Sequence, residues 1–157
     1  MLKFLKNLFH KEEKKEVGFD LCYLIKKYEG CKLEAYKCPA GVWTIGYGTT
    51  IYISGQKVRQ GDKITQEDAD SLLKWYCSHI ILPKGQFGVN QKIALYSLIY
   101  NIGQGAFDRS KCKKAIEAED WKTAKKEWTW TTAKGKELAG LVKRRKEEKE
   151  LFFKGLL

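Results

Sequence analysis

EGCKLEAYKCPAGVWTIGYG, which spans residues 29–48, is the stretch that decides the fold of this chain. Residues 42–49 are β-branched and aromatic with interspersed glycines, which is typical of a strand that bends or approaches other backbone closely. The turn signal Pro-Ala-Gly precedes them at residues 39–41, and residues 57–58 form a possible third strand. We therefore predict a small antiparallel sheet over residues 35–64.

Helical patterns flank this sheet on both sides. Apolar residues at helical spacing predict a helix over residues 19–28, which Gly30 ends in a left-handed conformation. Beyond the sheet the chain is predicted to be helical to its end, with a last helix over residues 141–153. The expected N-caps of the helices in between are Thr65, Asn90, Ser110 and Asp120. One helix, a small sheet and a group of helices predict an α+β protein with two lobes.

The composition fits one folded domain with a strong positive charge. The chain has 157 residues, of which 43% are hydrophobic, enough for a core and too many for a disordered chain. Its 30 basic and 19 acidic residues give a net charge of +11, which indicates an anionic partner such as nucleic acid, a lipid surface or an anionic polymer. Because the charge is spread along the chain, a nucleic-acid-binding arm is not favoured.

Residue types that bind metals or form disulfides are few and scattered. No Cys-x-x-Cys pair occurs and the chain has 2 histidines, so we expect no zinc site, no other metal and no cofactor. A disulfide scaffold is not expected at this size, and the cysteines are interpreted as small buried hydrophobes in a chain that folds in a reducing compartment. These cysteines are Cys22, Cys31, Cys38, Cys77 and Cys112.

Residues 1–17, MLKFLKNLFHKEEKKEV, are interpreted as a basic extension in front of a domain over residues 18–157. The extension lacks the continuous apolar region of a signal peptide. A membrane-spanning helix needs about 18 consecutive apolar residues, and no stretch of the chain is that long and apolar. Its first nine positions form a small amphipathic face, typical of a docked terminal helix or of a weak contact with a membrane surface or a partner. Both interpretations stay open.

Three residues at fixed intervals carry the chemical signal. Glu29 stands at the expected end of the first helix, where the helix dipole disfavours negative charge. Cys38 follows after eight residues, and Thr44 after five more. This spacing resembles the phage-type lysozymes (endolysins), the family of the phage T4 and lambdoid enzymes, in which a glutamate, an aspartate or cysteine and a threonine lie at these intervals.

The resemblance extends over about residues 18–154. Residues 91–110, QKIALYSLIYNIGQGAFDRS, resemble the family's central helix with its Asn-x-Gly end. Residues 128–151, which contain KGKELAGLVKRRKEEKEL, resemble its closing segment Gly-Leu-x-x-Arg-Arg-x-x-Glu. The resemblance implies a lysozyme-like α+β fold, with the active-site cleft between a small antiparallel β-sheet lobe and a helical lobe, in a catalytic domain over residues 18–157.

The same resemblance implies a catalytic set. Glu29 would be the general acid that protonates the leaving oxygen of a glycoside. Cys38 and Thr44 would flank the attacking water, and inversion would result. Aspartate is usual at the position of Cys38. The sulfur of Cys38 would act as a thiolate, orient water through its thiol, be an inactive substitution, or only pack as a small hydrophobe. We favour an active role, and direct attack by water over a covalent thioglycosyl intermediate. The family often has histidine at the position of Thr49, so an ion pair of that histidine is expected to be missing.

Other residues would bind substrate or shape the site. Taken alone, Arg144 and Arg145 would be solvated helix cations. The resemblance places Arg144 opposite the acid, where it would hold the site in shape or bind substrate. Asn101 would bind sugar or N-acetyl groups in the cleft, or else cap its helix. Tyr47 and Trp130 would stack on sugar rings.

The implied function is that of an endolysin muramidase, which hydrolyses the β-1,4 bond between N-acetylmuramic acid and N-acetylglucosamine in bacterial peptidoglycan and lyses the host cell. The rivals are a lytic transglycosylase on the same glycan and a non-enzymatic basic protein that binds walls or disrupts membranes. No motif favours a nucleic-acid binder. We expect a monomer without stable membrane insertion, made in the host cytoplasm and reaching the wall after membrane permeabilisation; a component of the virion is the alternative.

Overall fold

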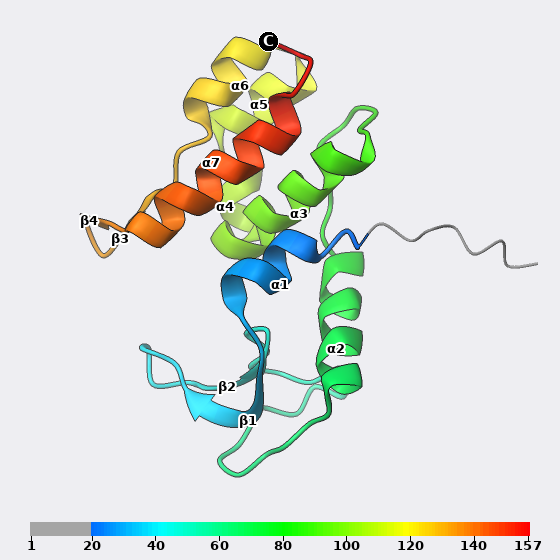
Figure 1. Ribbon diagram of the computed structural model, residues 1–157, viewed down its shortest axis with the longest axis vertical. Coiled ribbons are helices and arrows are strands. Elements are labelled where there is room, and N and C mark those ends of the chain that lie inside the picture. The colour runs from blue at the N-terminus through cyan, green and yellow to red at the C-terminus, as the bar shows by residue number, and fades with distance from the viewer. Residues whose placement is uncertain (1–19) are drawn as a thin grey trace, which may run out of the picture.

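The computed structural model describes residues 20–157, so the basic extension and its amphipathic face lie outside the described residues. Over this range the chain forms two lobes, as predicted (Figure 1). The smaller lobe holds a β hairpin and irregular loops, and the larger lobe is a group of helices. No helix within residues 20–157 has the length and apolar character needed to cross a membrane.

The smaller lobe is built around a β hairpin. β1 (Lys32–Lys37) follows α1 (Tyr23–Glu29) and pairs antiparallel with β2 (Trp43–Gly46). The hairpin turn falls at the predicted Pro-Ala-Gly. In the register of this pair, Tyr36 lies opposite Thr44. Because partners across an antiparallel pair point to the same face, the two side chains share one side of the sheet.

The prediction of a third strand at residues 57–58 is wrong. Lys57 forms only an isolated bridge with Ile51. The extended run stops there because the chain turns immediately afterwards: the backbone N–H of Arg59 donates to Asp62 Oδ2 at 2.9 Å. The regular sheet of this lobe therefore consists of β1 and β2 alone.

The glycines at the end of β2 produce the predicted bends. Gly46 has a φ of +61° and Gly48 a φ of +109°, conformations that favour glycine. A Cβ added at Gly48 would lie 3.5 Å from the hydroxyl of Tyr100, which donates to the carbonyl oxygen of Tyr47 at 2.7 Å. The glycines thus let the sheet lobe lie against the helical lobe.

Helices follow the sheet, as expected. They are α2 (Gln66–Ser78), α3 (Val89–Ile102), α4 (Gln104–Asp108), α5 (Lys111–Glu117), α6 (Trp121–Glu127) and α7 (Ala139–Phe153). Three predicted N-caps are confirmed, because the side-chain oxygens of Thr65, Ser110 and Asp120 accept from the backbone N–H three residues later at 3.1, 3.0 and 3.1 Å. Figure 1 shows α2 rising from the smaller lobe towards α1.

Other helix boundaries differ from the prediction. The N-cap of α3 is Gly88 and not Asn90, because the Gln91 side chain accepts from the Gly88 N–H at 2.9 Å. The last helix begins at Ala139, two residues earlier than expected. A short hairpin of β3 (Thr132–Ala133) and β4 (Lys136–Glu137), which the sequence did not suggest, precedes it.

Two apolar cores support the two lobes. The larger core lies among helices α3 to α7, and the smaller one joins α1 and α2 to the end of β2. Fully buried members of the larger core are Leu95, Leu98, Phe107, Ile116, Trp128 and Phe152. Buried members of the smaller core are Cys22, Ile25, Tyr47, Leu73 and Cys77. The last turn of α1 therefore lies where the two lobes meet.

Candidate active site

Glu29 is the last residue of α1 and lies where the chain leaves the helical lobe for the sheet. Gly30 ends the helix, and its N–H donates to the carbonyl of Lys26. Its φ is +66°, but its ψ of 172° places it outside the left-handed helical region that we predicted. The Glu29 side chain is 27% exposed, and Arg144 Nη1 donates to its Oε1 at 2.6 Å. The acid is thus held in place while remaining open to solvent.

A hollow of about 350 Å³ opens beside this pair. Glu29 and Arg144 line it together with Asn101, an exposed residue in the last turn of α3. The other lining residues are Tyr28, Leu138, Gly140 and Leu141. The structure therefore brings together three of the predicted residues, and Gly103 rather than Asn101 ends the helix.

Arg144 is buried and its guanidinium is fixed from several sides. Its Nε donates to Ser97 Oγ at 3.1 Å, and its Nη2 donates to the Ser97 carbonyl at 3.0 Å. Only 3% of the side chain is exposed. Because Nη1 is the nitrogen that reaches Glu29, the position of the acid follows from the packing of α7 against α3. This geometry suits a positioning residue.

A buried ionic cluster lies behind Arg144, which corrects the interpretation of Arg144 and Arg145 as solvated cations. Both arginines contact the Glu148 carboxylate, which is fully buried and also accepts from Ser97 Oγ at 2.6 Å and Trp128 Nε1 at 3.1 Å. Burial raises the pKa of Glu148 above its usual range, against the opposing effect of the arginines. The sequence contained the signal, because Glu148 follows Arg144 by four residues.

The last turn of α1 has a second attachment to α7. Glu147 accepts from Lys27 Nζ at 2.7 and 2.8 Å and from the Tyr28 hydroxyl at 2.6 Å. Burial acts to raise the pKa of Glu147, yet the hydrogen bonds from Lys27 and Tyr28 outweigh it and lower the pKa below its usual value. Three consecutive residues that end with Glu29 are therefore held by α7.

Cys38 and Thr44 lie on one face of the hairpin. Cys38 begins the turn, and its N–H donates to the Val42 carbonyl at 3.0 Å. Thr44 is buried, and its hydroxyl donates to that same carbonyl at 3.0 Å. Side chains alternate along a strand, so Tyr36, Cys38 and Thr44 point to the same side.

The electrostatics of this face tie it to the acid. Hydrogen bonds from the backbone of Val42 and Ala40 lower the pKa of the Cys38 thiol, and this effect outweighs burial, which acts to raise it. Burial raises the pKa of the Tyr36 phenol, and the negative charges of Cys38 and Glu29 raise it further. Tyr36, which lies opposite Thr44 in the hairpin, is a residue that the sequence reasoning missed although it stands two positions before Cys38.

Two predicted sugar-stacking residues are placed elsewhere. Tyr47 is 7% exposed and belongs to the smaller core, where its hydroxyl donates to Asp70 Oδ1 at 3.0 Å. Trp130 is partly buried against the helical core and does not line the hollow at Glu29. Their packing argues against a stacking role. Thr49 is buried and exchanges backbone hydrogen bonds with Ile45, both at 2.9 Å.

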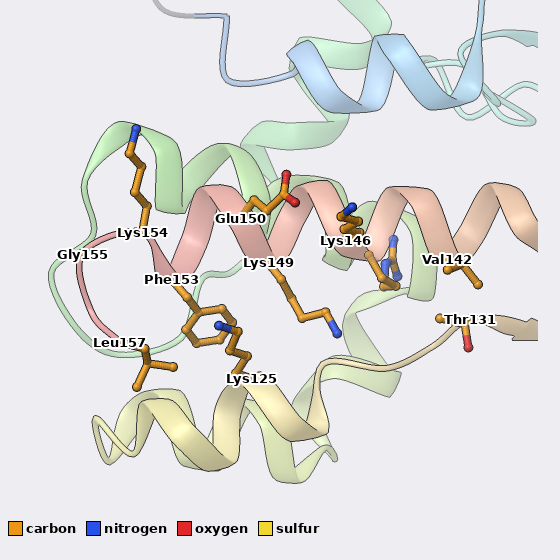
Figure 2. Close-up of a pocket in the computed structure, with 11 residues that line it drawn as sticks. Lys125, Thr131, Val142, Lys146, Lys149, Glu150, Phe153, Lys154, Gly155 and Leu157 are labelled. Carbon is orange, nitrogen blue, oxygen red and sulfur yellow. The ribbon is translucent and has the colours of Figure 1, made fainter.

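A larger hollow, of about 660 Å³, lies away from the acid between α6, α7 and the C-terminal residues. Figure 2 shows Lys125 and Lys149 reaching over it beside the ring of Phe153. Its size alone does not make it the site, because Glu150, the one acidic side chain that lines it, is exposed among lysines and lies away from the place where the two lobes meet. No cluster of three or more metal-ligating side chains occurs within residues 20–157.

A sheet lobe, a helical lobe and a carboxylic acid where they meet define the class of lysozyme-fold glycosidases. The family model for phage lysozyme matches residues 26–148. The chain belongs to the phage lysozyme family, and it is a lysozyme-type glycosidase.

Individual relatives agree with this assignment. An endolysin of Acyrthosiphon pisum secondary endosymbiont phage 1 is 42% identical over 139 residues, which cover 82% of this chain and 92% of the relative. A solved endolysin from Escherichia coli O157:H7 phage FAHEc1 has a TM-score of 0.75 at 34% identity and covers 88% of this chain and 94% of its own. The muramidase domain of SpmX from Asticaccaulis excentricus has a TM-score of 0.68 at 33% identity, covering 87% and 97%.

Proposed function

We propose that this chain is an endolysin muramidase, which hydrolyses the β-1,4 bond between N-acetylmuramic acid and N-acetylglucosamine in bacterial peptidoglycan. The observation that carries the proposal is the Glu29 carboxyl group, held by Arg144 at 2.6 Å at the edge of an open hollow between the lobes. The similar proteins are endolysins and a muramidase domain, which supports the same substrate for this chain.

In the proposed mechanism, Glu29 transfers a proton to the glycosidic oxygen as the bond to the anomeric carbon breaks. Water attacks the anomeric carbon from the opposite face, and its oxygen forms the new bond. Cys38 and Thr44 hold that water. The Thr44 hydroxyl donates to the Val42 carbonyl, so its oxygen keeps lone pairs that accept a hydrogen from the water.

Inversion requires space for a water molecule between the general acid on one side of the sugar and the group that activates the water on the other. The lowered pKa of Cys38 favours the thiolate, a better acceptor than the thiol for the proton that the water loses. Asn101, exposed at the rim of the hollow, offers an amide to the sugar's N-acetyl group.

The mass of the products tests this reaction against transglycosylation. Purified peptidoglycan is digested with the protein, and the released muropeptides are analysed by mass spectrometry. Hydrolysis adds one water per bond and leaves a reducing muramic acid end, which is the result that we expect. Products that end in anhydro-muramic acid, without the added water, would show that Glu29 serves a transglycosylase.

Release from the host is part of the proposal. We infer that the protein is made in the host cytoplasm, acts as a monomer and reaches the wall after the inner membrane is permeabilised. Residues 67–157 hold 18 basic and 12 acidic residues, an excess of 18 − 12 = +6. This charge would draw the protein to the anionic cell envelope.

A further inference from the structure

Two thiols meet between the helices that enter and leave the sheet lobe. Cys22, the N-cap of α1, and Cys77, near the end of α2, have their sulfur atoms 3.1 Å apart. Both residues are buried, at 5% and 6% exposed, in the smaller core. A disulfide bond is about 2.05 Å long, so the two sulfurs need to approach by only about 1 Å to become bonded.

The pair is buried but has an opening. A hollow of about 590 Å³ is lined by both cysteines and by two lysines, Lys26 and Lys74, with Asp20 as its one acid. A hydrogen bond with Cys77 lowers the pKa of the Cys22 thiol, and the charges of the two lysines act in the same direction, while burial and the charge of Asp20 oppose them. Lys26 is already paired with Asp20 at 3.0 Å and with Asp70 at 3.3 Å, whereas Lys74 forms no ion pair within residues 20–157 and can attract the carboxylate group of a small disulfide.

We propose that Cys22 and Cys77 form a redox-responsive disulfide that links α1 to α2, and that a carboxylate-bearing disulfide of the glutathione type is its oxidant. The chain holds the pair as thiols in a reducing compartment. It closes the bond when it meets such an oxidant, as it would on leaving that compartment. This inference does not depend on the proposed function.

The exchange balances in two steps. The Cys22 thiolate attacks one sulfur of glutathione disulfide, whose S–S bond breaks, and one glutathione thiolate leaves. Cys77 then loses its proton and attacks Cys22 Sγ, which forms the Cys22–Cys77 bond and releases the second glutathione. The two protein thiols are oxidised, the glutathione disulfide is reduced, and the two released thiolates take up the two protons.

The position of the bond gives it a structural effect. The ring that it closes runs from residue 22 to residue 77 and contains Glu29, Cys38 and the whole β1–β2 hairpin. At present α1 and α2 are joined by the small core and by the Lys26–Asp70 ion pair at 3.3 Å. A covalent link across the same contact would restrict the unfolded chain and stabilise the attachment of the sheet lobe.

The remaining thiols are placed differently. Cys112 is fully buried in the larger core, and its thiol donates to the Ala124 carbonyl, with 3.6 Å between sulfur and oxygen. Cys31 and Cys38 form no hydrogen bond to another sulfur within residues 20–157. Because Cys22 and Cys77 already touch, their pairing should outcompete any that involves Cys38. The proposed disulfide thus leaves the thiol of the candidate site free.

The test is oxidation of the folded, full-length protein with glutathione disulfide. We expect the free thiols, counted in denaturant, to fall from 5 to 5 − 2 = 3. Peptide mapping without reductant should show one link, between Cys22 and Cys77. The oxidised protein should unfold at a Tm higher by roughly 5 °C or more.

Single variants separate this pair from the other cysteines. Cys22→Ser should keep all four of its thiols after oxidation, whereas Cys77→Ser, which lacks the second thiol of the exchange, should retain one glutathione on Cys22 and keep three. Neither variant should gain thermal stability. Cys112→Ala, the matched control, should still lose two thiols and gain the same rise in Tm. In the wild-type protein, five thiols remaining, a link through Cys31 or Cys38, or glutathione left on Cys22 as the end product would each overturn the proposal. The wild-type map decides even where a variant fails to fold.

Discussion

Cys38 is the residue at which this site differs most from the aspartate that is usual in phage-type lysozymes. A thiol is a weaker acceptor than a carboxylate and must lose its proton to become a base. The turn at residues 38–42 assists this, because backbone hydrogen bonds from Val42 and Ala40 lower the pKa of the thiol. In the proposed mechanism, the hairpin therefore supplies part of what the carboxylate would contribute by itself.

Replacement of Cys38 separates the possible roles of its sulfur. If the thiolate accepts a proton from water, the lysis rate of the wild-type protein rises with pH as the thiol ionises. Cys38→Asp should remain active and move this rise to lower pH, because an ordinary aspartate has a pKa of about 3.9. Cys38→Ser should lose roughly 10-fold or more of the rate. Rates measured on purified walls from pH 4 to pH 9 test this, and full activity in Cys38→Ser would rule out thiolate chemistry.

Single residues also show what the sequence could predict. Glu29 and Arg144 were predicted from spacing and resemblance, and the structure places them in contact. The burial of Tyr47 could not be predicted because it depends on residues that are distant in sequence: its hydroxyl donates to Asp70 and its carbonyl accepts from Tyr100. Local sequence shows that an aromatic ring is available, but tertiary packing determines whether the ring is free.

At the scale of elements, the position of the acid is set by one helix acting on another. The last turn of α1 contacts α7 through Lys27, Tyr28 and Glu29 in succession. α7 is in turn fixed by the buried cluster around Glu148. A substitution in the part of α7 that does not line the hollow should therefore alter the position of the acid without removing a contact to the substrate.

Glu147→Gln tests this attachment. The folded protein holds the pKa of Glu147 below its usual value, so this residue contributes stability above the unfolded pKa, which is about 4.3, and that stability is lost as the pH falls through the folded pKa. We expect Glu147→Gln to lower the Tm by about 3 °C at pH 7 and by much less near pH 3. Thermal unfolding of both proteins over this pH range provides the measurement. An equal loss at both pH values would show that the charge of Glu147 is not involved.

Element boundaries were predictable where the signal was local. Thr65, Ser110 and Asp120 cap their helices through their own side chains, so their sequence pattern was sufficient. The third strand at residues 57–58 was not, because a single bridge to Ile51 depends on how the loop folds back. Short irregular segments of this kind carry no period from which to predict them.

For the whole molecule, the distribution of charge sets how the protein meets its substrate. The net charge of +11 is not concentrated at the acid. Part of it lies over the larger hollow on the other side of α7, where Figure 2 shows Lys125 and Lys149. We interpret this surface as one that attracts the envelope, while the smaller hollow carries out the cleavage.

Salt should therefore slow lysis by weakening encounter. At 0.1 M salt, exposed charges interact only over distances of about 10 Å. We therefore expect the lysis rate to drop several-fold between low and high salt. Lys125→Gln combined with Lys149→Gln should lower the rate at low salt and flatten the salt dependence. Lys113→Gln is the control, because Asp108 already pairs with Lys113 at 2.7 Å. If the double variant kept the wild-type salt profile, these lysines would have no part in encounter.

The rate at which Glu29→Gln lyses purified cell walls is the most direct test of the account. Glutamine keeps an oxygen for Arg144 but carries no acidic proton, so we predict a loss of roughly 100-fold or more with little change in Tm. Glu34→Gln is the matched control, because Glu34 is exposed on β1 and pairs with Lys63 at 2.7 Å, and this variant should lyse walls at the wild-type rate. Equal lysis by Glu29→Gln and the wild-type protein would contradict the central claim that this carboxyl group cleaves the glycan.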